Sequence, residues 1–286
     1  MKFLVSGANG FVGKSVVDEL RARGHDVTAL VRHGSVRDAQ IHLEMPTDTS
    51  AFGNLPLAGF HAVIHLAGVA HRRGSAPSVY QEVNCDLTVA LAEASAAAGV
   101  ERFVFASTAK VHGDRTDAGS VLTAASPYVP TDPYSQSKID AEVALLSIHL
   151  ESGMDIEIIR PPLVVAEHAK GNIALIRKLG SLRLPFPVAS VANRRTMISL
   201  ENLTEKVCAL AEQRSSNQYA VNLLGDEPVG STESLVHSVS PGIRTVRIPS
   251  RVIQLVAAVA KNYSSFDLSP LVDDFELEPG RQVIHE

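Results

Sequence analysis

Tyr134 and Lys138 have the residue types and the spacing of an acid–base pair. They follow Pro133 at the start of a long helix-patterned segment, and residues four apart share one face of a helix. A phenol has a reference pKa of about 10, so at neutral pH it transfers protons well only with a cation beside it. Lys138 would supply that cation. The pair predicts a tyrosine that exchanges a proton with a substrate oxygen, although such pairs also occur on plain helix surfaces.

Thr108 adds a second oxygen that could take part. A strand-like run at 101–106 is followed directly by Ser107 and Thr108. In parallel sheets, the carboxyl ends of the strands face the ligand. Thr108 could donate to, or accept from, the same substrate oxygen as Tyr134. A strand end and a helix start must therefore come together for this chemistry.

A glycine-rich turn near the N-terminus indicates what else binds there. The glycines are spaced G-x-x-G-x-x-G, with a short apolar strand before them and a helix-patterned segment after them that stops at Gly24. The first glycine can supply a tight turn, the second lets the backbone approach a diphosphate, and the third lets helix and strand pack closely. A dinucleotide site is the prediction. The contacts expected in this turn are Gly7, Asn9, Gly10, Phe11, Val12 and Gly13.

The end of the second predicted strand, at 25–31, bears on which dinucleotide binds. NAD sites commonly place a carboxylate there to bind the ribose 2′-hydroxyl. This sequence has Val31 and then Arg32. A guanidinium suits a 2′-phosphate, so NADP is favoured over NAD. The alternatives are that Arg32 is a solvated loop cation, or that His33 or Arg37 shares its role.

Strand-like and helix-like segments alternate along most of the chain. Strands are expected at 60–68, 101–106 and 218–223, and helices at 80–99, 133–152 and 201–214. This alternation predicts an α/β fold with a Rossmann-type doubly wound parallel sheet. Residues 1–165 are expected to form this domain, with 197–224 returning to it. Residues 166–196 and 225–286, with a helix near 251–262, are expected to form a small C-terminal lobe that caps the substrate.

The strand at 60–68 has an end suited to a cofactor. It finishes in Ala67 and Gly68, small residues of the kind needed where a cofactor passes over a strand end. With Leu66, these two residues are expected cofactor contacts.

The composition argues against several other classes of function. With a formal net charge of −5 over 286 residues, the chain has no excess of basic residues for nucleic acid. Cys85 and Cys208 lie in apolar surroundings without metal-ligand spacing, so buried thiols in a reducing compartment are expected, and no metal site. The longest later apolar run, at 252–260, is about half the length of a membrane span. The prediction is a cytoplasmic protein without membrane insertion.

The glycine turn, the strand ending at Thr108 and the Tyr134–Lys138 spacing follow one another in a familiar order. They resemble the extended short-chain dehydrogenase/reductases, in the nucleotide-sugar epimerase/dehydratase group, over at least residues 2–225. The resemblance implies that Thr108, Tyr134 and Lys138 are catalytic. The resemblance also implies cofactor contacts beyond the glycine turn and residues 66–68. These are Asn84, Ser107, Tyr134, Lys138, Pro161 and Val164.

The resemblance also implies where a nucleotide diphosphate binds. Asn172 matches an asparagine that contacts it in the family, and residues 193–199 resemble a segment whose arginine grips it. Arg195 is assigned that role, with Arg194 second, because a planar guanidinium can bind phosphate oxygens in a bidentate manner. A solvated pair of arginines is the alternative. The tail at 266–286 lacks the family's usual pattern.

The implied reaction is hydride exchange at a hydroxyl-bearing sugar carbon. In the 4,6-dehydratase branch an Asp-Glu pair follows the catalytic threonine, but Ala109 and Lys110 follow it here, so dehydration is not expected. Arg32 favours a reductase that acts on carbon 4 of a UDP-4-keto-6-deoxy-N-acetylhexosamine for surface polysaccharide synthesis. The alternatives are a UDP-glucose or UDP-N-acetylglucosamine 4-epimerase, a reductase of small non-nucleotide carbonyls, and a non-catalytic dinucleotide-binding sensor or scaffold.

Many members of the family dimerise through a four-helix bundle. The resemblance implies a homodimer here, formed by the helix that carries Tyr134 and the alanine-rich helix before it. The residues that would permit this contact are Ala90, Ala94, Ala97, Ala98 and those on the 139–150 face.

Overall fold

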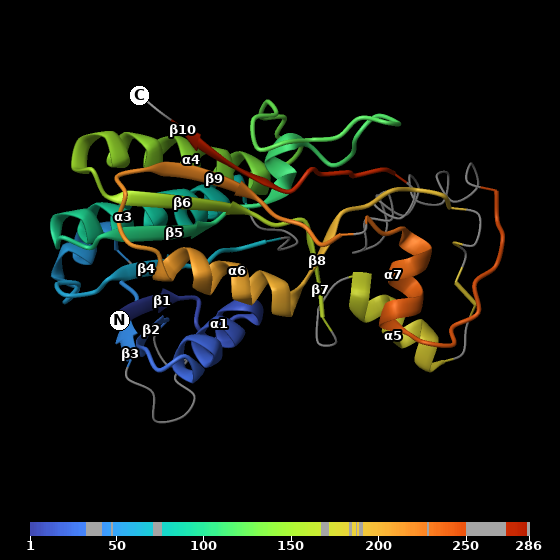
Figure 1. Cartoon of the computed structure of the whole chain (residues 1–286), viewed down its shortest axis with the longest axis horizontal. Coiled ribbons are helices and arrows are strands. Elements are labelled where there is room, and N and C mark those ends of the chain that lie inside the picture. The colour runs from blue at the N-terminus through green and yellow to red at the C-terminus, as the bar shows by residue number, and fades with distance from the viewer. Residues whose placement is uncertain are drawn as a thin grey trace.

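The chain folds into a sheet-based part and a smaller lobe beside it (Figure 1). The computed structural model describes residues 1–32, 42–46, 48–70, 76–166, 172–182, 185–186, 188, 191–227, 229–249 and 273–284. The lobe contains α5 (Asn172–Ser181) and α7 (Thr232–Val239). The helix expected near 251–262 lies outside the described residues.

Parallel strands make up nearly all of the main sheet. Its strands are β1 (Lys2–Ser6), β2 (Asp26–Val31), β3 (His42–Glu44), β4 (Ala62–His65), β5 (Arg102–Ala106), β6 (Asp155–Arg160), β9 (Tyr219–Leu223) and β10 (Gly280–Ile284). Their order is β10-β9-β6-β5-β4-β1-β2-β3, and β10 alone among these runs antiparallel to its neighbour. The winding reverses at β1, which pairs with β2 on one side and β4 on the other. This confirms the doubly wound sheet, whose switch point is where ligands bind.

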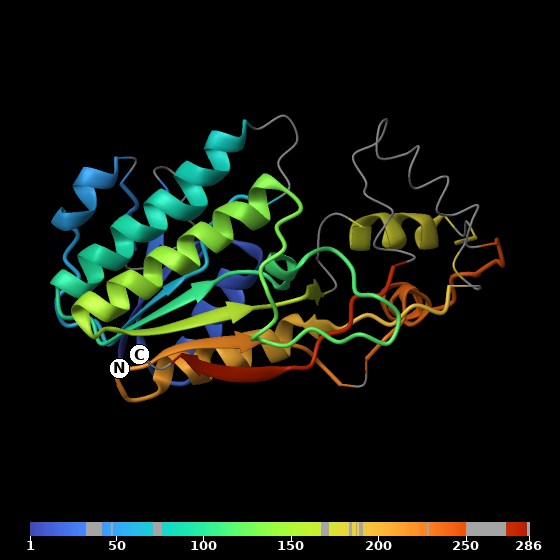
Figure 2. The ribbon, with the colours of Figure 1, turned by 90° about the horizontal axis from the view of Figure 1, so that it is seen from above.

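Helices cover both faces of the sheet (Figure 2). On one face lie α1 (Phe11–Ala22) and α6 (Leu200–Glu212), and on the other α3 (Leu87–Ala97) and α4 (Pro133–Ser152). Each layer packs because apolar side chains at helical spacing are removed from water, as Val16, Val17 and Leu20 of α1 are. Within the described chain, none of the helices has the length and apolar composition of a membrane span.

The helix predicted at 80–99 is not one regular helix. A short helix, α2 (Pro77–Tyr80), leads into a π-helical turn at Gln81–Asp86, which precedes α3. Such turns are frequent at functional sites, and this one carries the fully buried Asn84. On α4, Val143 and Leu150 are exposed on the segment proposed to form the dimer contact, and the homodimer stays a prediction.

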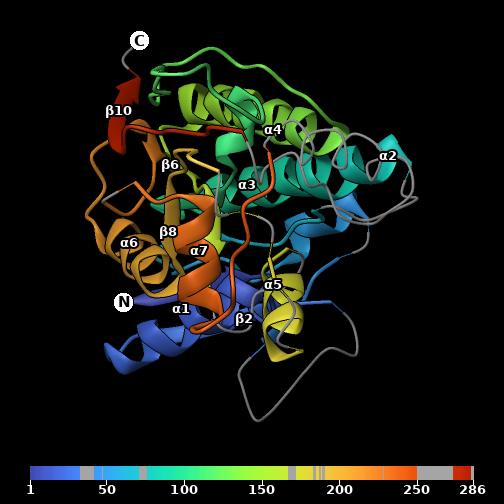
Figure 3. The same ribbon diagram turned by 90° about the vertical axis from the view of Figure 1, so that its right-hand side faces the viewer.

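The lobe is assembled from segments far apart in the sequence (Figure 3). A two-stranded parallel sheet, β7 (Leu163–Val165) and β8 (Met197–Ser199), links it to the main sheet. Helices α5 and α7 contact each other. The buried core of the lobe consists of Ile176, Phe186, Val188, Val191, Leu235, Val236 and Ile243.

Residues 273–279, here called the C-terminal strap, run from the lobe back to the main sheet. The strap lies between two segments: the N–H of Thr116 donates to the carbonyl of Asp274 at 2.8 Å, and the N–H of Thr196 donates to that of Phe275 at 2.9 Å. The strap ends in β10. The assignment of all of 225–286 to the lobe is therefore wrong for β10, which pairs with β9 and satisfies the backbone groups of that edge.

Candidate active site

The glycine turn joins β1 to α1 at the switch point of the sheet. Gly7 has a φ of 68°, which glycine adopts without strain, and a Cβ there would lie 2.7 Å from the backbone nitrogen of Ala67. A Cβ on Gly13 would lie 2.1 Å from the carbonyl oxygen of Gly7. The turn therefore brings the ends of β1 and β4 together and packs α1 closely against them.

The first turn of α1 suits a diphosphate. Gly10 is the N-cap residue, and no side-chain cap or acidic first-turn residue is found there in the described structure. Backbone N–H groups at a helix N-terminus, together with the helix dipole, favour an anion. The glycine turn and the start of α1 thus fit the pyrophosphate of a dinucleotide, in the place the sequence predicted.

Gly13→Ala is expected to destabilise the protein by about 1–3 kcal/mol, because the new methyl group overlaps the Gly7 carbonyl and α1 must move away. The same movement should weaken dinucleotide binding, measured by calorimetry alongside urea unfolding. Gly53→Ala is the matched control, since nothing lies within 4 Å of its added Cβ. Equal stability and affinity in the two variants would contradict the close packing of this turn.

Asn84 fastens the strand end after β4 to the helix that carries Tyr134. Its Oδ1 accepts the N–H of Val69 at 2.8 Å, and its Nδ2 donates to the carbonyl of Val69 and to the hydroxyl of Ser137, each at 3.0 Å. A Cβ on Gly68 would lie 3.1 Å from Asn84 Oδ1 and 3.4 Å from Lys138 Nζ. Asn84, predicted as a cofactor contact, thus holds the strand over which the cofactor is expected to pass.

A buried histidine supports the same strand end. His65 Nδ1 lies 2.6 Å from Ser6 Oγ, and its Nε2 lies 2.9 Å from Thr88 Oγ1. The hydroxyl of Thr88 donates to the carbonyl of Asn84 at 2.8 Å, so it accepts from Nε2, and Nδ1 accepts from Ser6. Burial lowers the pKa of His65 to about 3. The ring is therefore neutral at neutral pH, and these hydrogen bonds link β1, β4 and the π-helical turn.

Tyr134 and Thr108 meet at the carboxyl end of β5. Their side chains are hydrogen-bonded, and Thr108 Oγ1 also accepts the N–H of Lys110 at 3.2 Å. Loss of solvent contact raises the pKa of the Tyr134 phenol. The hydrogen bond from Thr108 and the charge of Lys110 oppose this rise, and Asp132 adds to it. The phenol thus carries its proton at neutral pH.

Lys138 is bonded to β5. Its Nζ donates to the carbonyl of Ala106 at 2.7 Å. Burial lowers its pKa to about 8, and Glu142 opposes that shift. Lys138 was expected to supply the positive charge that lowers the pKa of Tyr134. Among the described residues, Lys110 supplies that charge instead. Lys138 remains beside the end of β4, where contact with a nicotinamide ribose was predicted.

A buried ion pair, Glu142 with Arg160, lies one helical turn beyond Lys138. The Glu142 side chain is 0% exposed and that of Arg160 is 3% exposed. Glu142 also accepts hydrogen bonds from the hydroxyls of Ser107 and Tyr128. Ser107 was predicted to contact the cofactor, and in this structure its hydroxyl binds Glu142. The cluster joins the ends of β5 and β6 to α4 and so fixes the helix that carries Tyr134 and Lys138.

His112 completes the cluster around Arg160. Its Nδ1 lies 3.1 Å from the carbonyl of Pro127, so Nδ1 carries the hydrogen, and Nε2 accepts from Arg160 Nη1 at 3.0 Å. Burial lowers the pKa of His112, and the charge of Arg160 acts in the same direction. A neutral imidazole therefore serves as an acceptor for the buried guanidinium.

The two predicted phosphate-binding arginines have different surroundings. Arg195 is buried, with Nη1 donating to the carbonyl of Asp273 at 3.1 Å and the guanidinium 5.8 Å from the centre of the Phe275 ring. Arg194 is 62% exposed and forms two hydrogen bonds with Glu276, at 2.6 and 2.7 Å. The C-terminal strap thus holds both arginines, although its sequence had shown no recognisable pattern.

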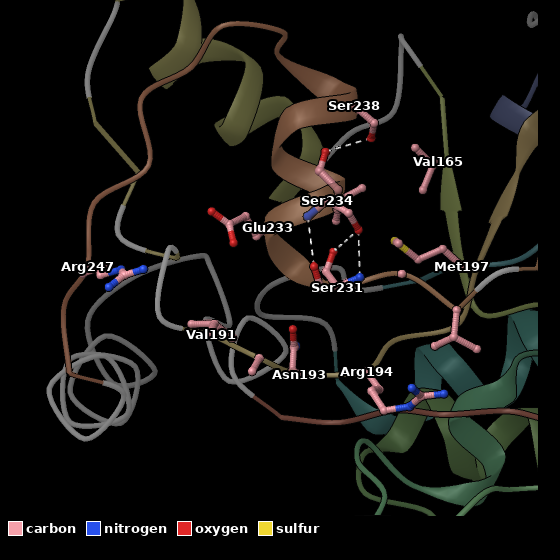
Figure 4. Close-up of a pocket in the computed structure, with 14 residues that line it drawn as sticks. Val165, Val191, Asn193, Arg194, Met197, Ser231, Glu233, Ser234, Ser238 and Arg247 are labelled. Atoms are coloured by element: carbon pink, nitrogen blue, oxygen red, sulfur yellow. Dashed lines mark hydrogen bonds between the residues drawn. The ribbon is translucent and has the colours of Figure 1, made fainter.

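A pocket of about 950 Å³ opens between α7 and β8 (Figure 4). Ser234 and Ser238 line it from α7, Ser231 lines it from the N-cap of that helix, and Asn193 and Arg194 line it from the segment before β8. Glu233 lines it as well, so the pocket presents hydroxyls, an amide, a guanidinium and a carboxylate to a polar ligand. In the described structure, Thr108, Tyr134 and Lys138 do not line this pocket.

The other predicted contacts are more widely distributed. Leu66 and Val164 pack beside the core on the α1 side of the sheet. The carbonyl of Pro161 accepts a hydrogen bond, at 2.9 Å, from the N–H of Ala109. Arg32 is exposed directly after β2, while positions 33 and 37 lie outside the described residues. Asn172 begins α5, but its side chain is also outside the described part.

Residues 3–222 match the sequence model of the NAD dependent epimerase/dehydratase family. The chain belongs to this family. A UDP-glucose 4-epimerase from Vibrio cholerae is 32% identical to it over 245 residues, which are 83% of this chain and 74% of that protein. The resemblance inferred from the motifs is thereby confirmed.

Solved structures share the fold of this family member over nearly its whole length. A UDP-glucose 4-epimerase from Thermotoga maritima, solved with UDP-glucose, has a TM-score of 0.74 and 19% identity, and the match covers 98% of this chain and 90% of that one. MoeE5 in complex with UDP-glucuronic acid and NAD has a TM-score of 0.74 and 22% identity, with 97% and 90% covered. At such identities the likeness shows the fold alone.

Three features around the site of this epimerase/dehydratase family member were not predicted. Glu142 follows Lys138 by four residues, the same spacing from which Tyr134 and Lys138 were predicted to be a catalytic pair, so a sequence signal for it existed. Lys110 had been noted only because it differs from the dehydratase pattern. The C-terminal strap carries no local signal, since its partners lie far away in the sequence.

Proposed function

We propose that this protein oxidises and reduces carbon 4 of a nucleotide sugar, and that its reaction is the 4-epimerisation of a UDP-hexose. The observation that carries the proposal is the meeting of Tyr134 with Thr108 at the end of β5, two strands away from the glycine turn that follows β1. A sugar hydroxyl placed between these oxygens can lose and regain its proton. The name of the Vibrio cholerae relative, which is matched over most of both chains, supports epimerisation.

Each side chain of the site has a separate task in this proposal. Tyr134 takes the proton of the sugar hydroxyl during oxidation and returns it during reduction. Thr108 holds the same oxygen and orients it. When bound at the glycine turn, a nicotinamide dinucleotide supplies the hydride acceptor and donor. Lys138 binds the ribose of that dinucleotide through an ammonium group whose lowered pKa leaves it partly protonated near pH 8.

The pocket between α7 and β8 is proposed to receive the nucleotide part of the substrate. Arg194 lines it and Arg195 follows directly in the sequence, and a guanidinium can bind the oxygens of a diphosphate. The serine hydroxyls of α7 offer partners for ribose or base. A uridine nucleotide is supported by the Thermotoga maritima enzyme, solved with UDP-glucose, and by MoeE5, solved with UDP-glucuronic acid.

Reduction of a 4-keto sugar is the second candidate, and Arg32 favours it. This arginine directly follows β2, where NAD-binding folds commonly place a carboxylate. A cation at this place suits the 2′-phosphate of NADPH, the usual cofactor of a net reduction. The substrate would be a UDP-4-keto-6-deoxy-N-acetylhexosamine.

Elimination of water is disfavoured by the residues after Thr108. Dehydration needs an acid and a base beside the sugar, but Ala109 is a buried methyl group, and Lys110 is engaged with Asp114 and Asp132 at 2.9 and 3.1 Å. These pairings support a site for hydride exchange alone.

The deciding experiment mixes purified protein with each candidate substrate and follows both the sugar and the reduced-nicotinamide absorbance. With NAD and UDP-glucose or UDP-N-acetylglucosamine, we expect a mixture of the two 4-epimers and no net change in absorbance. Stoichiometric, anaerobic loss of the NADPH band with the 4-keto sugar, and no epimerisation, would instead establish the reductase. Dinucleotide binding without turnover of any of these sugars would favour the sensor or scaffold.

A further inference from the structure

Lys110 links the turn after β5 to the start of the catalytic helix. It lies two residues after Thr108, in the turn Ala109–His112, and its backbone N–H donates to Thr108 Oγ1 at 3.2 Å. Its side chain reaches across to α4, where Nζ lies 3.1 Å from Asp132 Oδ2. Nζ also lies 2.9 Å from Asp114 Oδ1. One residue therefore contacts the catalytic threonine and the residue that precedes the catalytic helix.

Asp132 is the N-cap of α4 and so determines where the helix begins. Its Oδ1 accepts the N–H of Ser135 at 2.7 Å, and the Ser135 hydroxyl completes a capping box. The other carboxylate oxygen is left for Lys110. Tyr134 lies in the first turn of this helix, so the contact between Lys110 and Asp132 is made at the end of α4 that carries the phenol.

We propose that Lys110 is a positioning residue for the reaction: it fastens the start of α4 to the turn bearing Thr108 and places the positive charge that assists Tyr134. This role rests on the function proposed above. It also gives a reason for the departure from the dehydratase pattern, because the position that would hold a carboxylate there holds a cation here.

The charges around Tyr134 agree in sign with this role. Lys110 lowers the pKa of the phenol and Asp132 raises it, while Thr108 lowers it through a hydrogen bond. The aromatic ring facing Tyr134 is that of Tyr80, with ring centres 6.5 Å apart. On the same helix, Lys138 is bonded to the end of β5.

Lys110 keeps its charge across the working range of pH. Burial lowers the pKa of its ammonium group, but the hydrogen bonds and charges of Asp114 and Asp132 outweigh this, so the pKa is raised. If Lys110 were only a structural link between the turn and α4, removing its charge would leave the ionisation of Tyr134 unchanged. That difference separates the proposal from a plain structural role.

The test is the ionisation of Tyr134, followed by fluorine NMR in protein labelled with 3-fluorotyrosine. The chain has five tyrosines, and the resonance missing from Tyr134→Phe assigns the relevant one. Ring fluorination lowers the pKa of phenols and so moves the titration of Tyr134 to lower pH. We expect Lys110→Met to move the Tyr134 titration to higher pH, and Lys110→Arg to leave it close to that of the wild type.

Two further variants provide the control and the opposite sign. Asp132→Asn keeps a good helix cap but removes the negative charge, so the titration should move to lower pH. Asp114→Asn removes the more exposed partner of Lys110 and should change the titration least. If the Lys110→Met variant does not fold, the Lys110→Gln variant is used instead, because the glutamine amide can still donate a hydrogen bond to Asp132.

An unchanged Tyr134 titration in Lys110→Met or Lys110→Gln overturns the proposal. The titration needs no substrate, so it can be read even if the protein does not act on nucleotide sugars. With turnover available, the acid limb of the kcat/KM profile should move to higher pH in the same variants and be restored in Lys110→Arg. A loss of activity that is equal at every pH would also count against the role of the charge.

Discussion

Tyr134→Phe is expected to lower the turnover of the nucleotide sugar by about 100- to 10,000-fold, the usual contribution of a positioned acid–base group. The substitution removes the one hydroxyl that meets Thr108 at the end of β5 and leaves the ring in place. The dinucleotide is proposed to bind at the glycine turn, on the other side of β4, so its affinity should change little. Turnover and dinucleotide affinity are measured on the same preparations.

Tyr80→Phe is the matched control for this prediction. Tyr80 lies edge-on to Tyr134, with ring centres 6.5 Å apart, and it undergoes the same chemical change without belonging to the proposed site. Its turnover should stay near that of the wild type. If Tyr134→Phe also kept wild-type turnover, the catalytic site would have to lie elsewhere on the molecule.

Glu142→Gln is expected to lower the free energy of unfolding by about 3–5 kcal/mol, because it leaves a buried guanidinium without its counter-charge. Both side chains of the Glu142–Arg160 pair are almost fully buried, at 0% and 3% exposed. The carboxylate also accepts from Ser107 and Tyr128, so several hydrogen bonds weaken together. Urea unfolding followed by circular dichroism measures the loss.

An exposed pair provides the comparison for Glu142. Glu19 pairs with Arg23 at 2.8 Å on the surface of α1, with side chains 41% and 28% exposed. Because water and salt screen such pairs, Glu19→Gln should change stability far less than Glu142→Gln does. Similar losses in the two variants would show that burial does not determine the strength of the Glu142–Arg160 pair.

The sequence was enough to predict the features that depend on neighbouring residues. The glycine spacing requires close approach of helix and strand, and the structure has it, with a Cβ on Gly13 only 2.1 Å from the Gly7 carbonyl. The alternation of strands and helices predicted the doubly wound sheet, because parallel strands need crossover connections. The meeting of Thr108 with Tyr134 followed from placing one at a strand end and the other at a helix start.

Only the tertiary structure decided which partner each of these side chains has. Lys138 was expected to be the cation beside Tyr134, yet it donates to Ala106, and Lys110 takes that place. The C-terminal strap, which holds both arginines of the lobe, matched no pattern, and β10 returns to the main sheet. The physical reason is that helix and strand periodicity are local, whereas hydrogen bonds and ion pairs between residues about 80 apart, as from 195 to 273, depend on how whole elements pack.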